Sequence, residues 1–407
     1  MANLRPFKAA RPVPDKVHLV ASRSYVSYSR VKLRDKLEYN PYSFIHIINP
    51  EFGQKSISKP NTRARFRKVR ERYESFLREG IFLREEQACF YLYRQWHDKY
   101  SHTGIIAGVS ADDYLEGHVK IHEHTLAARE SMFKEYLDET NFNAEPVLLT
   151  FKDSGNFHEL LRPVMLEQAL YDFTTADKVR HQLWKIELPE RISQIQDYFK
   201  LVPNLYIGDG HHRCASSVLL ASDRKSKGID DAAGYFMSYL VPSSDISIHP
   251  FHRLVTDLGT YSEKSFLEKL QSHFDVKLCS KMSLPVARRH FSLYLEGHWY
   301  SLDLSAEKTP ENLTDAQVLT DLILAPLLQI VDLRHDQRIS FLGGSDRAME
   351  AQSLVDKGQF KAAFLLFPVS PDELMAVSDR NEMMPPKSTW VQPKLRSGLT
   401  IYELDRN

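Results

Sequence analysis

The sequence predicts a protein of the α/β (α+β) class with mixed sheets, and two observations support this. Segments typical of strands and of helices alternate along the whole chain of 407 residues, which is the pattern of sheets covered by helices. Hydrophobic residues make up 43% of the chain and charged residues 26%, as in an ordinary globular protein. We therefore expect two or three domains, or one large α/β body with additions.

Two changes along the chain suggest how it is divided. Beyond about residue 257 the alternation of helices and strands repeats on a smaller scale, so we predict a main α/β domain over 1–256 and a smaller α/β unit over 257–383. Prolines near the C-terminal end forbid a helix there. The tail 384–407 is therefore expected to be extended and to pack back on the main domain.

The expected helices and strands follow from hydrophobic periodicity and from end signals. The segment 61–80 has the clearest signals, because Asn61 or Thr62 can cap a helix and Gly80 can end it. We expect further helices at 122–139, 189–201, 211–223, 261–273, 315–330, 345–357 and 371–379. Short apolar runs predict strands at 43–50, 88–96, 103–110, 145–151, 183–188, 204–208 and 233–241, and a hairpin over 291–304.

Charge and cysteine content narrow the function classes. Fifty-three basic and fifty-three acidic residues cancel, so no field of the whole molecule favours nucleic acid or an anionic membrane. Cys89, Cys214 and Cys279 lie far apart without a C-x-x-C pair, which argues against a disulfide scaffold or a zinc ribbon. No apolar signal core and no apolar run of membrane-spanning length occurs. We expect a soluble, cytoplasmic protein with no membrane partner.

The most informative stretch is the turn after "LYIG", where the strand 204–208 meets the helix 211–223. A strand that enters a helix through glycine leaves main-chain N–H groups at the helix start, and these attract an anion together with the helix dipole. Arg213 adds a planar fork of donors suited to phosphate or carboxylate. We therefore predict a phosphate-binding turn that includes Gly210, although the P-loop pattern GxxxxGK[ST] is absent.

Asp209, His211 and His212 in the same turn are the candidate catalytic residues. Asp209 could bind a metal, orient a histidine or accept a proton from a hydroxyl group. His211 and His212 could donate to the bound anion or shuttle a proton. Two alternatives stay open: Asp209 only caps the helix while the histidines are solvated, or the histidines bind a metal.

A second group of ionisable residues lies in "EGHVKIHEHTLAARE" (116–130). If 118–130 were one helix, His118 and His122 would share a face. Glu123 follows the second histidine, however, so the HExxH pattern of zinc proteases is absent. Glu123 could act as a general base or a metal ligand, and a structural capping network is the alternative.

Two shorter motifs complete the candidate set. His252 and Arg253 in "HPFHRLV" form a second small anion fork, with a structural role as the alternative. Lys387 and Lys394 lie in "MPPKSTWVQPKL", where prolines stiffen the chain and a lysine can be held over an anion at little ordering cost. A surface or closing role fits these two lysines equally well.

Together these motifs resemble a bacterial and archaeal family known as domain of unknown function 1015. The matching stretches follow the family's order and span nearly the whole chain: "RPFKAARP" near the start, "KIHEHT" at 120–125, "IGDGHHRCASS" at 207–217, "HPFHRLV" at 249–255 and "MPPKSTWVQPKLRSGL" at 384–399. Family members usually carry a Pro-Pro-Tyr-Asp segment near the N-terminus. This chain has "VASRSYVSYS" (20–29) there, so an aspartate that other members could use is missing.

The turn "DGHHR" is also similar to the phosphate-binding turn of the ParB/sulfiredoxin superfamily, which includes a partition CTPase, sulfiredoxin and free-serine kinases. This resemblance implies that four residues of the turn hold a phosphate: Gly210, His211, His212 and Arg213. It further implies that Asp209 holds Mg²⁺ or the acceptor hydroxyl group.

From these features we predict a phosphoryl-transfer enzyme that acts on a small hydroxylated metabolite. The specific hypothesis is serine with ADP or ATP as donor, or the reverse or phosphatase reaction on phosphoserine, with Mg²⁺ as the metal. The ligand would be a small phosphorylated metabolite or a nucleotide, and a homodimer stays open. A non-enzymatic nucleotide-binding switch is the alternative. A ParB-like DNA-binding protein is less favoured because the net charge is zero.

Overall fold

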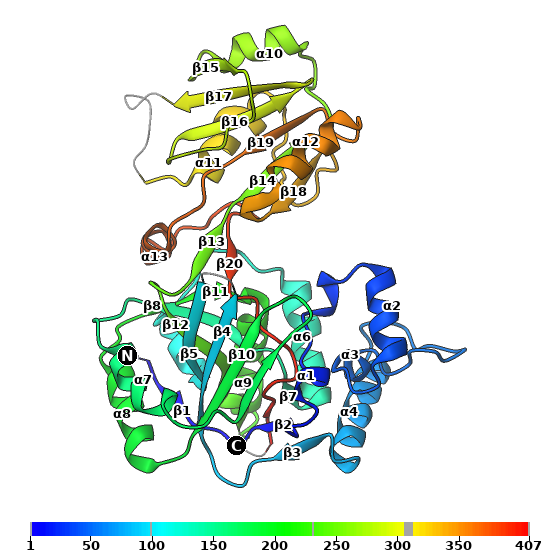
Figure 1. Ribbon diagram of the computed structural model, residues 1–407, viewed down its shortest axis with the longest axis vertical. Helices are drawn as coiled ribbons and strands as arrows, with labels where there is room; N and C mark the ends of the chain where they lie inside the picture. Colours follow the sequence, from blue (N-terminus) through cyan, green and yellow to red (C-terminus); the bar gives the residue numbers. More distant parts are fainter. Residues whose placement is uncertain (1, 98–99, 230–231, 305–311, 406–407) are drawn as a thin grey trace. The chain divides into compact units, whose positions relative to one another are not determined.

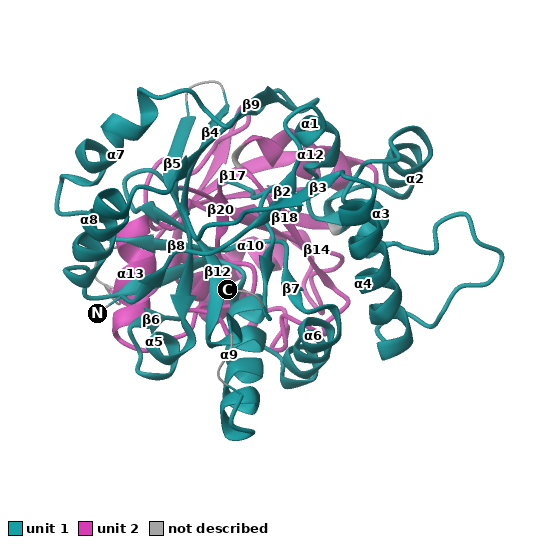
Figure 2. Ribbon diagram, turned by 90° about the horizontal axis from the view of Figure 1, so that it is seen from below, with its two compact units in different colours: residues 1–121, 125–246, 393–407 teal, residues 122–124, 247–392 magenta. Residues whose placement is uncertain are grey.

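The computed structural model describes residues 2–97, 100–229, 232–304 and 312–405. The chain forms two compact units, coloured separately in Figure 2. Unit 1 comprises residues 1–121, 125–246 and 393–407, and unit 2 comprises residues 122–124 and 247–392. In each unit sheets and helices are combined, so the α/β (α+β) class with mixed sheets is confirmed.

The boundaries of the two units differ from those that the sequence suggested at 256/257 and 383/384. The chain passes into unit 2 after Ile246, because β14 (Phe251–Val255) is already an inner strand of the sheet of unit 2. The tail is shared between the units. Its first part, up to Gln392, pairs within unit 2 through β20 (Trp390–Gln392), and its last part, from Pro393, belongs to unit 1.

Unit 1 is built on a nine-stranded mixed sheet (Figure 1). β11 is parallel to β6 and β12 is parallel to β8, whereas the other pairs are antiparallel. In sheet order the strands are β6 (Val119–Lys120), β11 (Leu205–Asp209), β8 (Val147–Phe151), β12 (Tyr235–Pro242), β5 (Tyr100–Ser110), β4 (Phe90–His97), β10 (Arg180–Ile186) and β9 (Tyr171–Thr174), with β1 (Leu4–Arg5) paired to β5. Two small ribbons accompany it, β2 (Ala10–Pro12) with β3 (Phe82–Arg84) and β7 (Phe142–Asn143) with β21 (Tyr402–Glu403).

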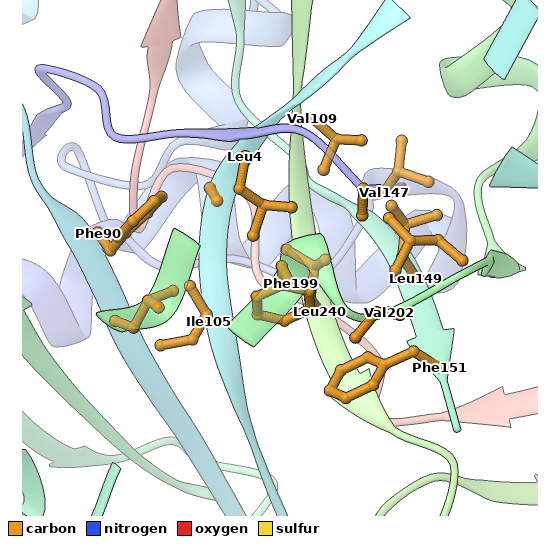
Figure 3. Packing of buried hydrophobic residues seen from close by; sticks show 14 of the residues in the cluster. Leu4, Phe90, Ile105, Val109, Val147, Leu149, Phe151, Phe199, Val202 and Leu240 are labelled. Carbon is orange, nitrogen blue, oxygen red and sulfur yellow. The ribbon is translucent and has the colours of Figure 1, made fainter. Parts of the chain in front are cut away.

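One face of this sheet carries the main hydrophobic core of unit 1. Apolar side chains of the sheet pack against α7 (Phe157–Met165) and α8 (Pro189–Lys200), and several of them appear in Figure 3. The rings of Phe151 and Phe199, both fully buried, lie 5.1 Å apart at their centroids. At about 25 cal/mol per Å² of buried apolar surface, such contacts are the main force that holds the helices to the sheet.

The remaining helices of unit 1 include the long basic one predicted at 61–80. This helix, α4 (Arg63–Arg78), begins at Thr62, whose hydroxyl oxygen accepts a hydrogen bond from the Arg65 amide at 3.4 Å, and Gly80 follows its end with a φ of 69°. The cap and the stop signal are thus confirmed. The others are α1 (Val17–Val20), α2 (Arg30–Tyr39), α3 (Ile45–Ile48), α5 (Ala111–Leu115), α6 (Ala127–Thr140) and α9 (His211–Ser226), with short 3₁₀ turns at Tyr25–Ser27 and Ala232–Gly234.

Unit 2 contains an antiparallel six-stranded sheet with a hydrophobic core on each face. Its strands, in sheet order, are β15 (Phe274–Cys279), β17 (His298–Leu304), β16 (His290–Leu295), β19 (Ala362–Leu365), β14 (Phe251–Val255) and β18 (Ile339–Gly343). Residues of α12 (Ala348–Asp356) pack on one face, and residues of α10 (Glu263–Leu270) and α11 (Asp315–Leu319) pack on the other. α13 (Pro371–Asp379) and the ribbon of β13 (Ser247–His249) with β20 (Trp390–Gln392) complete the unit.

Three expectations from the sequence were wrong, each because local periodicity did not decide the conformation. The apolar run 43–50 forms the helical turn α3 and not a strand, which is a known ambiguity of short apolar runs. The helix expected at 122–139 begins only at Ala127. The helix expected at 315–330 ends as a π-helical turn over Thr320–Leu324, shortly before Pro326, which cannot donate a helical hydrogen bond.

In the described ranges, the structure contains no helix that combines the length and the apolar character needed to cross a bilayer.

The substitution Gly104→Ala in β5 tests how closely β5 and β12 approach each other. A Cβ atom at this position would lie 2.2 Å from the carbonyl oxygen of Leu240 in β12, so we expect Gly104→Ala to lower the free energy of unfolding by about 3 kcal/mol or more. The control is Gly234→Ala, where a Cβ atom would meet no described heavy atom within 4 Å and stability should change by less than about 1 kcal/mol. Urea unfolding of the two variants measures this, and an equal loss in both would contradict the packing described here.

Candidate functional site

The predicted turn between a strand and a helix is present in unit 1. β11 ends at Asp209, Gly210 is the N-cap of α9 with φ 101° and ψ 31°, and the first helical hydrogen bond joins the Cys214 amide to the Gly210 carbonyl at 2.9 Å. Within the described residues no side chain caps this helix, and its first turn carries no acidic residue. Asp209 therefore does not cap α9, which removes the capping alternative for this residue.

Gly210 is required in this turn for two reasons. Its φ of 101° lies in the left-handed region, which favours glycine. In addition, the guanidinium group of Arg213 folds back over the turn, so that a Cβ atom on residue 210 would lie 3.0 Å from Arg213 Nη2. The glycine thus leaves room for the guanidinium group of Arg213 beside the backbone at the start of the helix.

The guanidinium group of Arg213 connects the turn to the neighbouring strand. Its Nη1 donates to the carbonyl oxygen of Pro146 at 2.7 Å and lies 3.3 Å from Glu145 Oε1, and its Nη2 lies 3.4 Å from Asp209 Oδ2. Lys394 adds a second cation, with Nζ 3.7 Å from the same Asp209 oxygen. Two cations and two carboxylates, all partly exposed, therefore surround the N-terminus of α9.

Glu145 is the member of this group that sequence reasoning missed. It stands two residues before β8, and β8 is antiparallel to β11, so the start of one strand lies beside the end of the other. The sequence places Glu145 before an apolar run but does not say which strand lies next to it. Lys394 had been noted in its Pro-stiffened segment, but without a partner.

The two histidines of the turn have different surroundings. His211 is buried, with an exposed fraction of 6%. The His212 ring is half-buried, and its Nε2 accepts a hydrogen bond of 3.2 Å from the amide of Leu126, the N-cap residue of α6. Because Nε2 is the acceptor, a neutral His212 carries its proton on Nδ1. This contact holds the start of α6 against the start of α9, and it explains why α6 begins later than its sequence predicts.

The chemistry of the turn fits a magnesium–phosphate ligand better than a metal bound by protein alone. The described residues include no group of three or more His, Cys, Asp or Glu side chains placed to hold a metal ion. Asp209 and Glu145 contact the same guanidinium group and could provide the one or two carboxylates that Mg²⁺ usually takes from a protein, the other ligands being water and phosphate. The prediction that Asp209 holds a metal stays a prediction.

Other predicted residues lie in unit 2, where one tail segment brings them together. Arg253 of β14 is fully buried and donates to the carbonyl oxygens of Phe251 at 2.8 Å and Lys387 at 2.9 Å. Its guanidinium carbon lies 4.8 Å from the centre of the Phe341 ring. Burial lowers the pKa of Arg253 to about 9. The donors of Arg253 are thus directed to main-chain carbonyl groups, and the residue fixes the conformation of the tail around Lys387.

His252 is buried beside Arg253. Its Nδ1 accepts a hydrogen bond of 3.3 Å from the Leu366 amide, so the neutral ring fits this position. Burial, and then the charge of Arg253, lower the pKa of His252 to about 4. The role of this pair in anion binding stays a prediction, but both side chains serve the packing of unit 2.

Glu123 and Lys387 both lie beside the main-chain hydrogen bonds made by the tail segment 384–387. Glu123 is half-buried, and the carbonyl oxygen of the preceding His122 accepts a hydrogen bond of 2.8 Å from the Met384 amide. Lys387 has a left-handed φ of 58°, and its Nζ lies 5.5 Å from the centre of the Phe251 ring. Because β6 ends at Lys120 and no helix follows before α6, His118 and His122 do not share a helical face.

The basic residues of α4 are partly paired with carboxylates of unit 1. Arg65 and Lys68 both contact the buried carboxylate of Glu51. Arg67 Nε lies 3.0 Å from Glu139 Oε1. These ion pairs neutralise part of the basic charge, as expected of a surface helix in an ordinary globular protein.

The family predicted from the motifs is confirmed by comparison with family models. Residues 4–324 match the model of a family described as "Protein of unknown function (DUF1015)". No curated protein matches the chain.

Solved structures that are similar to the chain at low identity include the following three. A free serine kinase in complex with AMP has a TM-score of 0.36 and 15% identity, over 74% of this chain and 91% of that one. SbnI with a C-terminal truncation, from Staphylococcus aureus, has a TM-score of 0.39 and 14% identity, over 72% and 85%. A conserved hypothetical protein from Pyrococcus furiosus has a TM-score of 0.35 and 15% identity, over 74% and 95%. Likenesses this low carry no argument about function.

The buried ring of His252 predicts a dependence of stability on pH. In the unfolded chain the pKa returns to about 6.5, so the unfolded state binds one more proton between about pH 6.5 and pH 4, and stability falls as the pH falls through this range. We expect wild type to lose about 2 kcal/mol more between pH 7 and pH 5 than His252→Asn, whose Oδ1 can still accept the Leu366 amide. Urea unfolding at the two pH values measures this, and equal losses in both proteins would show that His252 is not buried as a neutral ring.

Proposed function

Since the chain belongs to the DUF1015 family, whose name gives no reaction, we propose its function from the site: a phosphoryl-transfer enzyme that binds a phosphate group at the N-terminus of α9. Its substrate is a small hydroxylated metabolite, with serine or phosphoserine as the specific proposal and ADP or ATP as the donor or acceptor. We place this activity in the cytoplasm. The three cysteines of the protein are free thiols, which suits a reducing compartment such as the cytoplasm.

The observation that carries this proposal is the start of α9 itself. The main-chain N–H groups in the first turn of this 16-residue helix have no side-chain cap among the described residues. Arg213 and Lys394 both contact Asp209, which lies next to this turn. The helix dipole, the amides and the two cations all favour an anion at the same point. Since Arg213 contacts Glu145 and Asp209 through partly exposed ion pairs, which contribute little, a phosphate can compete for its donors.

In the proposed reaction, binding and charge neutralisation provide most of the catalysis. Arg213 and the amides of the turn hold the phosphate oxygens, and Lys394 neutralises charge beside them. Asp209 accepts the proton of the acceptor hydroxyl group. His212, whose Nε2 accepts from the Leu126 amide, can donate a hydrogen bond from Nδ1 to a leaving oxygen and so stabilise its charge, whereas His211 is buried beside it in the turn.

Mg²⁺ would be held by Asp209, with Glu145 as a second carboxylate, and would neutralise charge on the phosphate groups when bound. The residues predicted in unit 2 are not needed for this part of the proposal: Glu123, His252, Arg253 and Lys387.

A nucleotide-binding switch without turnover is the second candidate. The contact between Lys394 and Asp209 favours it, because this contact ties the tail of the chain to the turn, and a ligand at the turn would then change the position of the tail. Both candidates predict stabilisation of the protein by ADP or ATP, and turnover separates them.

Replacing Arg213 with alanine tests the proposed reaction. We expect wild-type protein with Mg²⁺ to convert serine and ADP or ATP, or phosphoserine, and Arg213→Ala to lower this rate about 10²–10³-fold, because one strong donor to the transferred phosphate is lost. Phosphorus NMR follows the reaction. If folded wild-type protein turns over none of a panel of small phosphorylated metabolites but is stabilised by nucleotide, the switch is correct and the enzyme is not.

Gly210→Ala, compared with Gly155→Ala, tests the role of the turn. Both glycines have nearly the same φ, 101° and 102°, so both variants should lose about 1–2 kcal/mol of stability from backbone strain. A Cβ atom at residue 155 meets no described heavy atom within 4 Å, whereas one at residue 210 lies 3.0–3.1 Å from the guanidinium group of Arg213, which must shift to make room for it. We expect only Gly210→Ala to lose thermal stabilisation by ADP and phosphoserine. Equal losses of this ligand effect in the two variants would contradict a site at the turn.

A further inference from the structure

A second group of cations lies in unit 1, away from the turn of α9, around the carboxylate of Asp177. Arg396 is buried, with an exposed fraction of 6%, and its Nη2 lies 2.7 and 2.9 Å from the two carboxylate oxygens of Asp177. The same nitrogen donates to Thr175 Oγ1 at 3.2 Å. The Nε of Arg396 is buried and has no hydrogen-bond partner among the described residues. The N–H group at Nε of Arg396 is thus an unused donor inside this group.

Arg23 joins the group from the N-terminal part of the chain. Its Nη2 lies 2.5 Å from Asp177 Oδ2, and its side chain is 45% exposed. The position of Arg23 is set by the backbone: Ser22 and Ser397 exchange two main-chain hydrogen bonds, of 3.2 and 2.8 Å, which place residues 23 and 396 side by side. Two arginines from opposite ends of the sequence therefore share one carboxylate.

Lys36 of α2 is the third cation, and it has no carboxylate of its own. Its Nζ lies 5.5 Å from the centre of the Tyr28 ring, and it makes no ion pair within the part of the chain that the structure describes. Burial, and then the charge of Arg396, lower the pKa of Lys36. Asp177, by contrast, keeps a pKa well below its usual range: burial would raise it, but the hydrogen bonds from Thr175 and Arg396 outweigh burial.

One buried, one half-buried and one exposed cation (Arg396, Lys36 and Arg23) around one carboxylate leave an excess of positive charge. Uncompensated charge in a partly buried position is unfavourable, and the lowered pKa of Lys36, which comes first from burial and then from the charge of Arg396, agrees with this. The neighbouring His181 cannot supply negative charge, and burial followed by the charge of Arg396 lower its pKa to about 3, so it stays neutral. An added acidic group would relieve the repulsion and accept hydrogen bonds from the unused donors.

The tail connects this group to the turn of α9. Lys394, which reaches Asp209 at the turn, stands two residues before Arg396, so their Cα atoms are at most about 7 Å apart. One cation of each group, Lys394 at the turn and Arg396 at Asp177, thus lies on the same short segment of unit 1.

We propose that Arg396, Arg23 and Lys36 form a second anion site in unit 1, which binds an acidic group, a carboxylate or a phosphate, of the same molecule whose phosphate binds at Gly210 and Arg213. This inference rests on the proposed function, and it narrows the substrates to molecules with two acidic groups. Phosphoserine, with a phosphate and a carboxylate, and a nucleoside diphosphate both meet this requirement.

Two pairs of ligands separate the two sources of the second acidic group. Phosphoserine and phosphoethanolamine differ by a carboxylate, and ADP and AMP differ by one phosphate. Dissociation constants of all four are measured by calorimetry for wild type, Lys36→Met, Arg23→Gln and Arg213→Ala. The control is Arg34→Met, which removes one positive charge from the same helix, where Arg34 pairs with Glu38 in an exposed position.

In one of the two pairs, we expect Lys36→Met and Arg23→Gln to weaken binding of the ligand with the extra acidic group, phosphoserine or ADP, at least tenfold. For its partner ligand, and for every ligand with Arg34→Met, the change should stay within about twofold. A selective effect on phosphoserine assigns a carboxylate to the site, and a selective effect on ADP assigns a phosphate. Equal weakening of both members of each pair, or no change, overturns the second site.

Arg213→Ala distinguishes failure of this inference from failure of the proposed function. It should weaken all four ligands, because they share the phosphate that binds at the turn. If it has no effect while Lys36→Met does, the proposed function fails, and with it the idea that one molecule occupies both groups. If it weakens all four while Lys36→Met and Arg23→Gln act on none, the proposed function stands and the second site is wrong.

Discussion

The left-handed turn at Gly210 is the constraint on which the candidate site depends. Because residue 210 has no side chain, Arg213 can fold back over the start of its own helix and reach the Pro146 carbonyl oxygen at the head of β8. This contact joins the start of α9, directly after β11, to the head of β8, which is distant in the sequence. The uncapped amides, the carboxylates of Asp209 and Glu145 and the cation of Arg213 are brought together as a result.

A buried arginine has a comparable role in unit 2. Arg253 directs its donors to carbonyl groups of its own strand and of the tail. Among the described residues it has no carboxylate partner, and a fully buried guanidinium group in this situation is costly. Its position over the Phe341 ring offsets part of that cost. The motifs around His122, Arg253 and Lys387 therefore meet at the segment 384–387, which gives a structural reason for charged residues in a part of the chain that is mostly buried.

How far the sequence predicts this structure depends on how local each signal is. The turn at 209–213, the cap at Thr62 and the hairpin at Gly297 were predicted correctly, because glycine, threonine and apolar periodicity act within a few residues. Helix α6 begins late because its N-cap amide bonds to His212, which is distant in the sequence. Glu145 and the group around Asp177 were not predicted at all, since their contacts depend on strand order and on the return of the tail.

The most direct test of the account is a crystal structure of the protein with a bound phosphomonoester such as phosphoserine. The account predicts phosphate oxygens within hydrogen-bond distance of the amides of residues 211–213, with the guanidinium group of Arg213 moved from Glu145 to the phosphate. A phosphate bound elsewhere, with Arg213 still on Glu145 and the Pro146 carbonyl oxygen, would contradict the central claim that the start of α9 is the phosphate site.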